Sequence, residues 1–388
     1  MARILQAYEG PHGGIANHVR VLATGLASRG HEVTVAGPLE SQAYPDLERA
    51  GIRTERLPFT GSITAVGQDS RTARGLARII RAGGFEVAHA HGMKAGVVLR
   101  SVAAARRIPV LYTPHGFPFI FSEHRDDLRH PRLRRAMAIT AERTLGMFTA
   151  RLICVSEAER GFADKHHIAR ADRRKVVPNG VAVDRAITPD PALVSWRGDG
   201  PLFAALSVLR WEKGLHHLID AAALLGDAPP GLKLAIAGDG PEREALSERI
   251  ERAGVGDRIR LFAGFAPRVE ERLAAIDGFV LPSDRWEAGP IALIEAMAFG
   301  LPAIGSRLGG VPELIEGGRS GLLVPAGDPT ALAAAIRRLA DDRGRASAMG
   351  ERGRELAETR FSLDGMVEAV EELYLEVAPT RRARIGSP

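Results

Sequence analysis

The chain has 388 residues, of which 45% are hydrophobic and 26% are charged; this length favours two domains, and the composition is ordinary for a soluble α/β protein. No apolar run approaches the ~20 residues of a membrane span, no signal-peptide core is found, and the single cysteine, Cys154, excludes an internal disulfide. The low cysteine content favours a reducing, cytoplasmic compartment. The net charge is +5, and its distribution along the chain is uneven.

Short apolar strands alternate with amphipathic helices throughout the chain, which is the pattern of parallel α/β sheets. In the first half, a strand leads through a glycine loop into a helix over 15–29. Ser156 and Glu159 form a capping box that opens a later helix, and Cys154 lies in an apolar strand as a buried thiol. The strands expected in this half are 3–7, 32–37, 85–92, 109–116 and 151–156.

A turn-rich stretch between roughly Val181 and Gly200 is the expected linker to a second α/β series. We expect domains 1–184 and 185–361, with a last helix at about 362–378 that packs back onto the first domain. Two open parallel sheets predict a ligand cleft between the domains, at the carboxyl ends of the strands. The elements expected in the second half are strands 202–208, 233–240, 259–264, 278–283, 302–306 and 321–325 and a helix over 330–342.

The stretch SDRWEAGPIALIEAMAFG places Glu287 and Glu295 on either side of an expected helix start. Pro290 suits a first helical turn, so the helix should begin near Ile291. The free amide groups and the dipole at the start of this helix can bind a phosphate, and the two carboxylates would face the hydroxyl groups of a nucleotide sugar. The alternative is that Glu295 is a plain exposed helix residue and Glu287 a loop acid, and the spacing alone leaves both interpretations open.

Other strand-to-helix loops carry similar signals. LRWEKG places Arg210, Lys213 and Gly214 at a turn where cations can meet phosphate oxygens. The ordered set EKG, AGDGPE, EAGPIALIEAMAFGLPAI and GGVPELI resembles the family-four retaining glycosyltransferases, over nearly the whole chain and most densely between Ser207 and Asp328. The resemblance implies the GT-B fold, in which two Rossmann-like domains face each other across a cleft.

The resemblance also implies roles for the residues at matching positions. Glu295 would hold the ribose hydroxyls, and Glu287 would contact hydroxyls of the transferred sugar. Lys213 would neutralise the departing diphosphate, and His115 of TPHG would lie at the donor sugar. The resemblance also implies that Gly13 and Gly14 lie close to the donor phosphate and the acceptor. Gly289, Pro290 and Ile291 would lie at the sugar and the phosphates, and the nucleobase would lie near Gly264, Phe265 and Ala266.

Two positions depart from the family pattern. Where the family often has an arginine five residues before the lysine, this chain has Val208, and Arg210 is our candidate for the missing cation. Pro290 replaces a frequent glycine and removes one amide donor from the sugar site, which should alter donor fit more than activity.

The resemblance implies a retaining hexosyltransferase that uses no metal and no cofactor beyond its nucleotide-sugar co-substrate. Lys213, Arg210 and a helix dipole would stabilise the diphosphate, and Glu287 would position the sugar and not act as a covalent nucleophile. The expected donor is a UDP-hexose or UDP-N-acetylhexosamine, with GDP-mannose second, and the hydroxyl acceptor belongs to cell-envelope polysaccharide or glycolipid synthesis.

Alternatives remain. The acceptor could be a small natural product or cyclitol, and Val208 keeps open a non-catalytic GT-B subunit that binds nucleotide sugar. A hydrolysing or epimerising GT-B enzyme would need an acid/base set that the sequence does not present. His89 and His91 share one strand face as a candidate metal pair, but no third ligand has suitable spacing, so we expect no metal site.

The basic residues are unevenly distributed. Residues 1–184 carry 27 basic and 17 acidic side chains, against 25 and 30 in the remainder. Without a recognisable module or interleaved aromatic residues, a nucleic-acid partner is not expected. Arginines at positions 71, 74, 78 and 81 recur at helical spacing, which predicts either peripheral contact with the anionic inner face of a membrane or a solvated helix surface.

Overall fold

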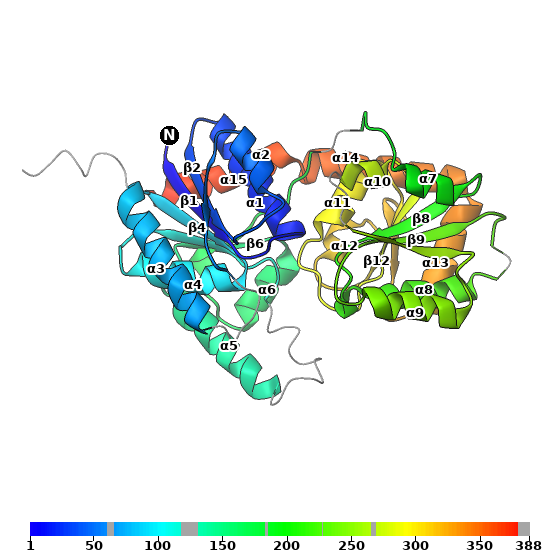
Figure 1. The fold of residues 1–388 in the computed structure, drawn as a ribbon, viewed down its shortest axis with the longest axis horizontal. Coiled ribbons are helices and arrows are strands. Elements are labelled where there is room, and N and C mark those ends of the chain that lie inside the picture. Colours follow the sequence, from blue (N-terminus) through cyan, green and yellow to red (C-terminus); the bar gives the residue numbers. More distant parts are fainter. Residues whose placement is uncertain (60–65, 118–130, 183–184, 227, 265–268, 379–388) are drawn as a thin grey trace, which may run out of the picture. The chain divides into compact units, whose positions relative to one another are not determined.

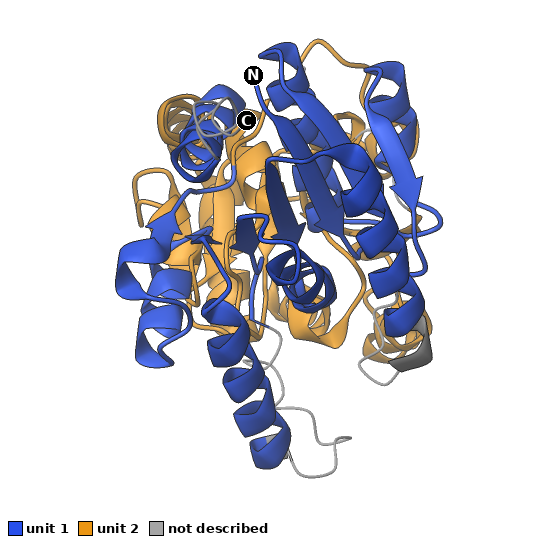
Figure 2. Ribbon diagram, turned by 90° about the vertical axis from the view of Figure 1, so that its left-hand side faces the viewer, with its two compact units in different colours: residues 1–179, 363–388 blue, residues 180–362 orange. Residues whose placement is uncertain are grey.

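A computed structural model describes residues 1–59, 66–117, 131–182, 185–226, 228–264 and 269–378. These residues form two compact units, each built on one parallel sheet with helices (Figure 1). Unit 1 comprises Met1–Asn179 and Leu363–Pro388, and unit 2 comprises Gly180–Ser362 (Figure 2). Among the described residues, no helix has both the length and the apolar character to cross a membrane.

Unit 1 contains a parallel sheet of seven strands in the order β3-β2-β1-β4-β5-β6-β7. The order reverses between β1 and β4, the switch point where α/β sheets bind ligands. Its strands are β1 (Arg3–Tyr8), β2 (Glu32–Gly37), β3 (Arg53–Arg56), β4 (Val87–His91), β5 (Val110–Thr113), β6 (Arg151–Cys154) and β7 (Arg174–Val176). Its helices are α1 (Gly14–Ser28), α2 (Tyr44–Arg49), α3 (Val66–Gly83), α4 (Met93–Ala104), α5 (Pro131–Gly146), α6 (Glu157–Lys165), the 3₁₀ turn η2 (Ala171–Arg173) and α15 (Leu363–Val377).

Unit 2 contains a parallel sheet of six strands in the order β10-β9-β8-β11-β12-β13, with its switch point between β8 and β11. Its strands are β8 (Leu202–Leu206), β9 (Lys233–Gly238), β10 (Ile259–Ala263), β11 (Gly278–Leu281), β12 (Ala303–Ser306) and β13 (Gly321–Val324). Its helices are α7 (Pro191–Arg197), the 3₁₀ turn η3 (Trp211–Lys213), α8 (Leu215–Leu224), α9 (Arg243–Ala253), α10 (Val269–Leu273), α11 (Ile291–Ala298), α12 (Val311–Leu314), α13 (Pro329–Asp341) and α14 (Arg343–Arg360).

The apolar runs of the sequence coincide with strands in both sheets, and the expected fold class is confirmed. Inner strands such as β4 and β5 are buried along their whole length, because helices cover both faces of a parallel sheet. Cys154 is a buried free thiol at the end of β6, as predicted. The two strands that the sequence did not indicate, β3 and β7, are polar edge strands of three or four residues, so they carry no apolar period.

The C-terminal helix α15 belongs to unit 1, where it packs against α1. The hydroxyl of Tyr374 on α15 is 2.7 Å from Nδ1 of His89 and 3.3 Å from Nε2 of Gln6, and all three side chains are buried. Glu371 on the same helix lies 2.7 Å from Nε2 of His31. The last helix therefore closes the hydrophobic core that the first half of the chain begins.

Two sequence expectations were wrong in detail. Residues Pro191–Arg197, inside the expected linker, form helix α7, because the Asp190 side chain caps its first amides and Leu193 is buried in the core of unit 2. The capping box before α6 is half formed: Ser156 Oγ accepts the Glu159 amide. The Glu159 carboxylate instead accepts the amides of Val155 and Gly116, at 2.8 and 2.6 Å.

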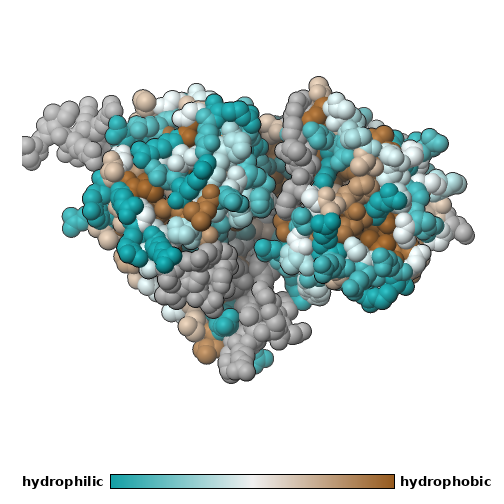
Figure 3. Space-filling view, in the orientation of Figure 1, coloured by the Kyte–Doolittle hydropathy of each residue, from teal (hydrophilic) through white to brown (hydrophobic). Residues whose placement is uncertain are grey.

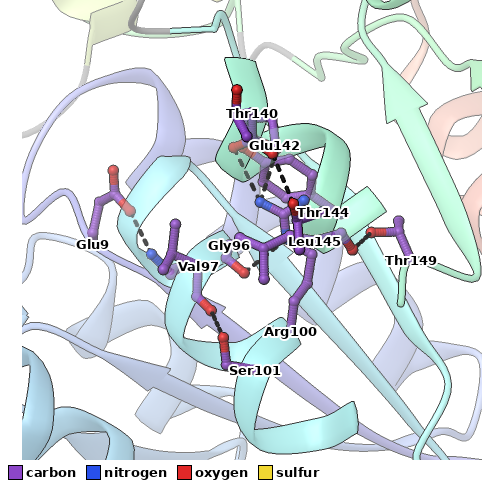
Figure 4. Close-up of polar contacts among 12 residues, drawn as sticks. Glu9, Gly96, Val97, Arg100, Ser101, Thr140, Glu142, Thr144, Leu145 and Thr149 are labelled. Carbon is purple, nitrogen blue, oxygen red and sulfur yellow. Dashed lines mark hydrogen bonds and ion pairs between the residues drawn. The ribbon is translucent and has the colours of Figure 1, made fainter. Parts of the chain in front are cut away.

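A buried ion pair joins α4 to α5 in unit 1 (Figure 4). The Arg100 guanidinium is 2.9 Å from the Glu142 carboxylate and lies over the ring of Tyr112, whose hydroxyl donates to Glu142 at 3.2 Å. Figure 4 also shows Glu9, which accepts the Ala95 amide at 2.7 Å at the start of α4. The loop after β1 is thus tied to the helix after β4, on the two sides of the switch point.

Candidate active site

The loop after β11 and the start of α11 hold the two carboxylates that the sequence singled out. Helix α11 begins at Ile291 with Pro290 as its N-cap at φ −68°, so Glu287 lies in the loop and Glu295 lies in the helix, as predicted. Both are nearly inaccessible, with 7% and 8% of their surface exposed. The interpretation of Glu295 as a plain exposed helix residue is therefore wrong.

Glu287 is the centre of a small polar network. Its Oε1 accepts a hydrogen bond from Lys213 Nζ at 2.7 Å and another from Ser283 Oγ at 2.5 Å. Lys213 comes from η3 after β8, and Ser283 follows β11, so the network spans the switch point of the second sheet. Ser283 is fully buried. Sequence reasoning missed Ser283, although its place at a strand end, four residues before Glu287, was a usable signal.

Glycines allow the loops around this network to approach one another closely. Gly214 has φ 62°, and a Cβ there would lie 2.0 Å from the Pro282 carbonyl oxygen. Gly309 has φ 53°, and a Cβ there would lie 2.0 Å from the Glu287 carbonyl oxygen, which also accepts the Gly310 amide at 2.8 Å. Any larger residue at these two positions would push apart the backbones that present Lys213 and Glu287.

The proposed substitute cation, Arg210, lies at the N-cap of η3 with an exposed side chain. Its Nη1 is 3.7 Å from Glu212 Oε1, a loose surface pair. The Glu212 carbonyl accepts the amides of Asp284 and Arg285 at 3.0 and 3.3 Å, which fastens η3 to the loop after β11. The Arg285 guanidinium lies 4.9 Å from the ring centre of Trp211.

The remaining candidates of unit 2 lie at strand ends and at the helix start. Gly289 and the N-cap Pro290 lead into α11, which begins at Ile291, and all three residues are partly exposed. Gly264 directly follows β10 with φ 90°. Phe265 and Ala266 lie outside the described residues.

In unit 1 the candidate residues gather at the carboxyl ends of β1, β4 and β5. Gly13 caps α1 with φ 83°, and Gly14 is the first residue of that helix. His115 follows β5 in the left-handed region at φ 54°, a conformation that costs a residue with a side chain roughly 1–3 kcal/mol. The buried Glu159 holds the adjacent Gly116 amide at 2.6 Å and so supports the loop that presents His115.

Burial sets the protonation of several groups at this end of the first sheet. The pKa values of Glu9 and Glu159 are each raised to about 7 by burial, although backbone hydrogen bonds favour their charged forms. Burial lowers the pKa of His18 to about 4 and the pKa of His115 well below its usual range. The imidazoles here are therefore neutral near pH 7, so His115 can accept a hydrogen bond.

Comparisons with known proteins agree for both halves of the chain. Residues 12–185 match the model described as Glycosyltransferase Family 4, and residues 190–356 match Glycosyl transferases group 1. A mannosyltransferase of Mycobacterium tuberculosis, described as GDP-mannose-dependent alpha-(1-6)-phosphatidylinositol monomannoside mannosyltransferase, is 30% identical over 91% of this chain and 92% of its own.

Other similar proteins are either much longer than this chain or similar to it mainly in fold. An exopolysaccharide phosphotransferase of Streptomyces coelicolor is 32% identical over 67% of this chain. The chain spans 26% of the length of this relative and 58% and 38% of the lengths of two other curated relatives. The Anabaena protein HepE, solved with UDP and glucose, aligns over 97% of this chain and 100% of its own with a TM-score of 0.82 at 22% identity. That similarity shows a common fold.

Proposed function

Because this chain belongs to the family-four glycosyltransferases of the GT-B fold, we propose that it moves a hexose or an N-acetylhexosamine from a nucleoside-diphosphate donor to an acceptor hydroxyl. The observation that carries the proposal is the network of Lys213, Ser283 and Glu287 at the switch point of the second sheet, beside the buried Glu295. Burying a carboxylate together with a lysine costs free energy of folding, so stability does not explain this network. A site for a polar, charged substrate does explain it.

The donor would be held by groups of opposite character. The first-turn amides of α11 and the Lys213 ammonium would meet the diphosphate, and Glu295 would accept from the ribose hydroxyls. Both described hydrogen bonds of the Glu287 carboxylate end on Oε1, which leaves Oε2 to accept from a sugar hydroxyl. Glu287 would therefore position the sugar while Lys213, drawn to the phosphate, stabilises the charge of the leaving group.

We propose that the transfer retains the anomeric configuration and needs no metal. The bond between the anomeric carbon and the diphosphate oxygen breaks, and the acceptor oxygen bonds to the same face of that carbon. The acceptor proton passes to the departing phosphate, and the charge left on the diphosphate is met by Lys213 and the helix dipole. Arg210, whose exposed side chain can reorient, is proposed as a second phosphate partner.

The donor nucleotide is proposed to be UDP, with GDP second. The Anabaena structure contains UDP, and the mycobacterial relative is described as GDP-mannose-dependent, which supports both nucleotides as candidates. A thermal-shift screen with UDP-glucose, UDP-N-acetylglucosamine and GDP-mannose tests the proposal, because a ligand of the folded state raises the melting temperature. No shift with any donor at millimolar concentration would contradict it.

The acceptor is proposed to be a cell-envelope polysaccharide or glycolipid, with peripheral binding of unit 1 to an anionic membrane face. Arg71, Arg74, Arg78 and Arg81 are all exposed on α3, and Figure 3 shows hydrophilic side chains interspersed with hydrophobic patches on this face of unit 1. Each basic residue near an anionic surface adds roughly 1 kcal/mol, screened by salt. Flotation with anionic liposomes at low and high salt tests this; no binding at low salt would favour a soluble acceptor such as a cyclitol.

A further inference from the structure

Three histidines from three different elements converge at the switch point of unit 1. His18 lies on α1, His91 ends β4, and His115 follows β5. One ring nitrogen of each lies within 4.8 Å of the others, and Nδ1 of His91 is 3.3 Å from Nε2 of His115. The ring centre of His18 is 5.2 Å from the ring centre of His91 and 4.6 Å from that of His115. No spacing in the sequence indicates this group, because its members lie 24 or more residues apart.

The fourth histidine of the neighbourhood is already committed. Both ring nitrogens of His89 are engaged, with Tyr374 at 2.7 Å and with Thr113 at 2.8 Å. In contrast, Nε2 of the fully buried His91 has no hydrogen-bond partner among the described residues. The pair foreseen on β4, His89 with His91, is therefore not the relevant set; His91 pairs instead with two residues from elsewhere.

These imidazoles have the properties of metal ligands. A ligand imidazole needs a ring nitrogen with an available lone pair, and both ring nitrogens of His18 and Nε2 of His91 are buried without a hydrogen-bond partner among the described residues. Zn–N bonds of about 2.0–2.1 Å in a tetrahedron separate the ligand nitrogens by about 3.3 Å. Nδ1 of His91 and Nε2 of His115 are this far apart, but they share a hydrogen bond, which an ion would replace once the donor ring carries its proton on its other nitrogen; the ligand nitrogen of His18 lies within 4.8 Å of both.

We propose that His18, His91 and His115 form a site for one divalent transition-metal ion of the Zn²⁺ class, with three imidazole ligands and an open fourth position. Imidazole donors suit zinc, copper and nickel better than magnesium or calcium, which prefer oxygen. His115 is partly exposed while His18 and His91 are buried, so an ion reaches the site from the side of His115, where the open position also lies.

Metal binding has a consequence that rests on the proposed function. A bound ion would occupy a ring nitrogen of His115, the group proposed to lie at the donor sugar. Zinc would then inhibit sugar transfer, and a chelator would restore it. If zinc binds without inhibiting, the placement of His115 at the donor sugar is wrong, whereas the metal site itself stands.

The test uses tag-free full-length protein, because an affinity tag of histidines would bind the probe. A second group in unit 2, His216, His217 and Asp284, also has ligand atoms within 4.8 Å of one another but is only half-buried. His217→Asn removes it and serves as the matched control. Zn²⁺ is titrated by calorimetry, and Co²⁺ is used as a probe because tetrahedral Co²⁺ has intense visible absorption.

The chosen variant is His115→Asn, because asparagine tolerates the left-handed backbone at this position. It should weaken Zn²⁺ binding by more than 10-fold and abolish the tetrahedral cobalt spectrum, while His217→Asn keeps both. His18→Asn, checked for folding by its melting curve, should behave like His115→Asn. Equal affinity of His115→Asn and the parent protein, or loss of binding only in His217→Asn, would overturn the proposal.

Discussion

Replacing Ser283 by alanine removes the hydroxyl that donates to Glu287 Oε1 at 2.5 Å and leaves the Lys213 bond in place. Ser283 is fully buried, so water cannot replace the hydroxyl without a rearrangement. A hydrogen bond to a charged group contributes about 1.5–3 kcal/mol, and each ~1.4 kcal/mol corresponds to a factor of ten in rate. If Glu287 positions the sugar in the transition state, kcat/KM should fall roughly 10-fold to 150-fold.

The assay measures initial rates of nucleoside diphosphate release with the donor selected by thermal shift. Ser283→Cys, which keeps the shape but donates weakly, should lose nearly as much activity as Ser283→Ala. Ser207→Ala is the matched control, since Ser207 also follows a strand of this sheet but its hydroxyl donates to the neighbouring Val208 carbonyl, at 3.2 Å, and not to a carboxylate. Unchanged kcat/KM in a folded Ser283→Ala variant would refute the role of this hydroxyl in holding Glu287.

Three further predictions concern the donor site of unit 2 and the buried histidines of unit 1. Glu295→Ala should weaken the binding of free UDP and GDP, because the ribose loses its acceptors, and calorimetry should detect this; equal affinity for both nucleotides would remove the ribose assignment. Lys213→Ala should lower kcat about 100-fold to 10,000-fold, and a loss of only a few-fold, with a larger loss in Arg210→Ala, would transfer the phosphate role to Arg210. The folded-state pKa of His18 is lowered from 6.5 to about 4, so its stabilising contribution is present above pH 6.5 and is lost as the pH falls from 6.5 to 4; the raised pKa values of Glu9 and Glu159 act in the opposite sense. Because His89, His91 and His115 are shifted in the same direction as His18, the melting temperature should fall between pH 6.5 and 4.5, and a rise there would contradict it.

Much of the fold was predictable from the sequence because its inner strands are buried on both faces. The runs around Leu202, Lys233 and Gly278 are continuous and apolar, and each is a strand. The edge strands β3 and β7 and the helix at Pro191 were missed because polar residues or turn signals dominate there. A local hydrophobic pattern appears only where a segment buries several side chains, and these three segments bury few.

The site was predictable where chemistry follows from one local stretch. Glu287 and Glu295 flank a helix start that Pro290 announces, and the structure has that helix start. The partners of His91 were not predictable, because their proximity depends on which strands are neighbours. Strand order is a property of the whole sheet, and spacing along the chain does not encode it.

The most direct test of the central claim is donor turnover in the absence of an acceptor, followed by proton NMR with time. In the absence of an acceptor, a water molecule can accept the sugar in its place. This hydrolysis is slow, so a high protein concentration is used to observe it. A retaining enzyme should release the α-anomer first from an α-linked donor, and Lys213→Ala should slow this release about 100-fold or more. A β-anomer as first product, or tight donor binding with no release by the parent protein, would contradict a retaining glycosyltransferase.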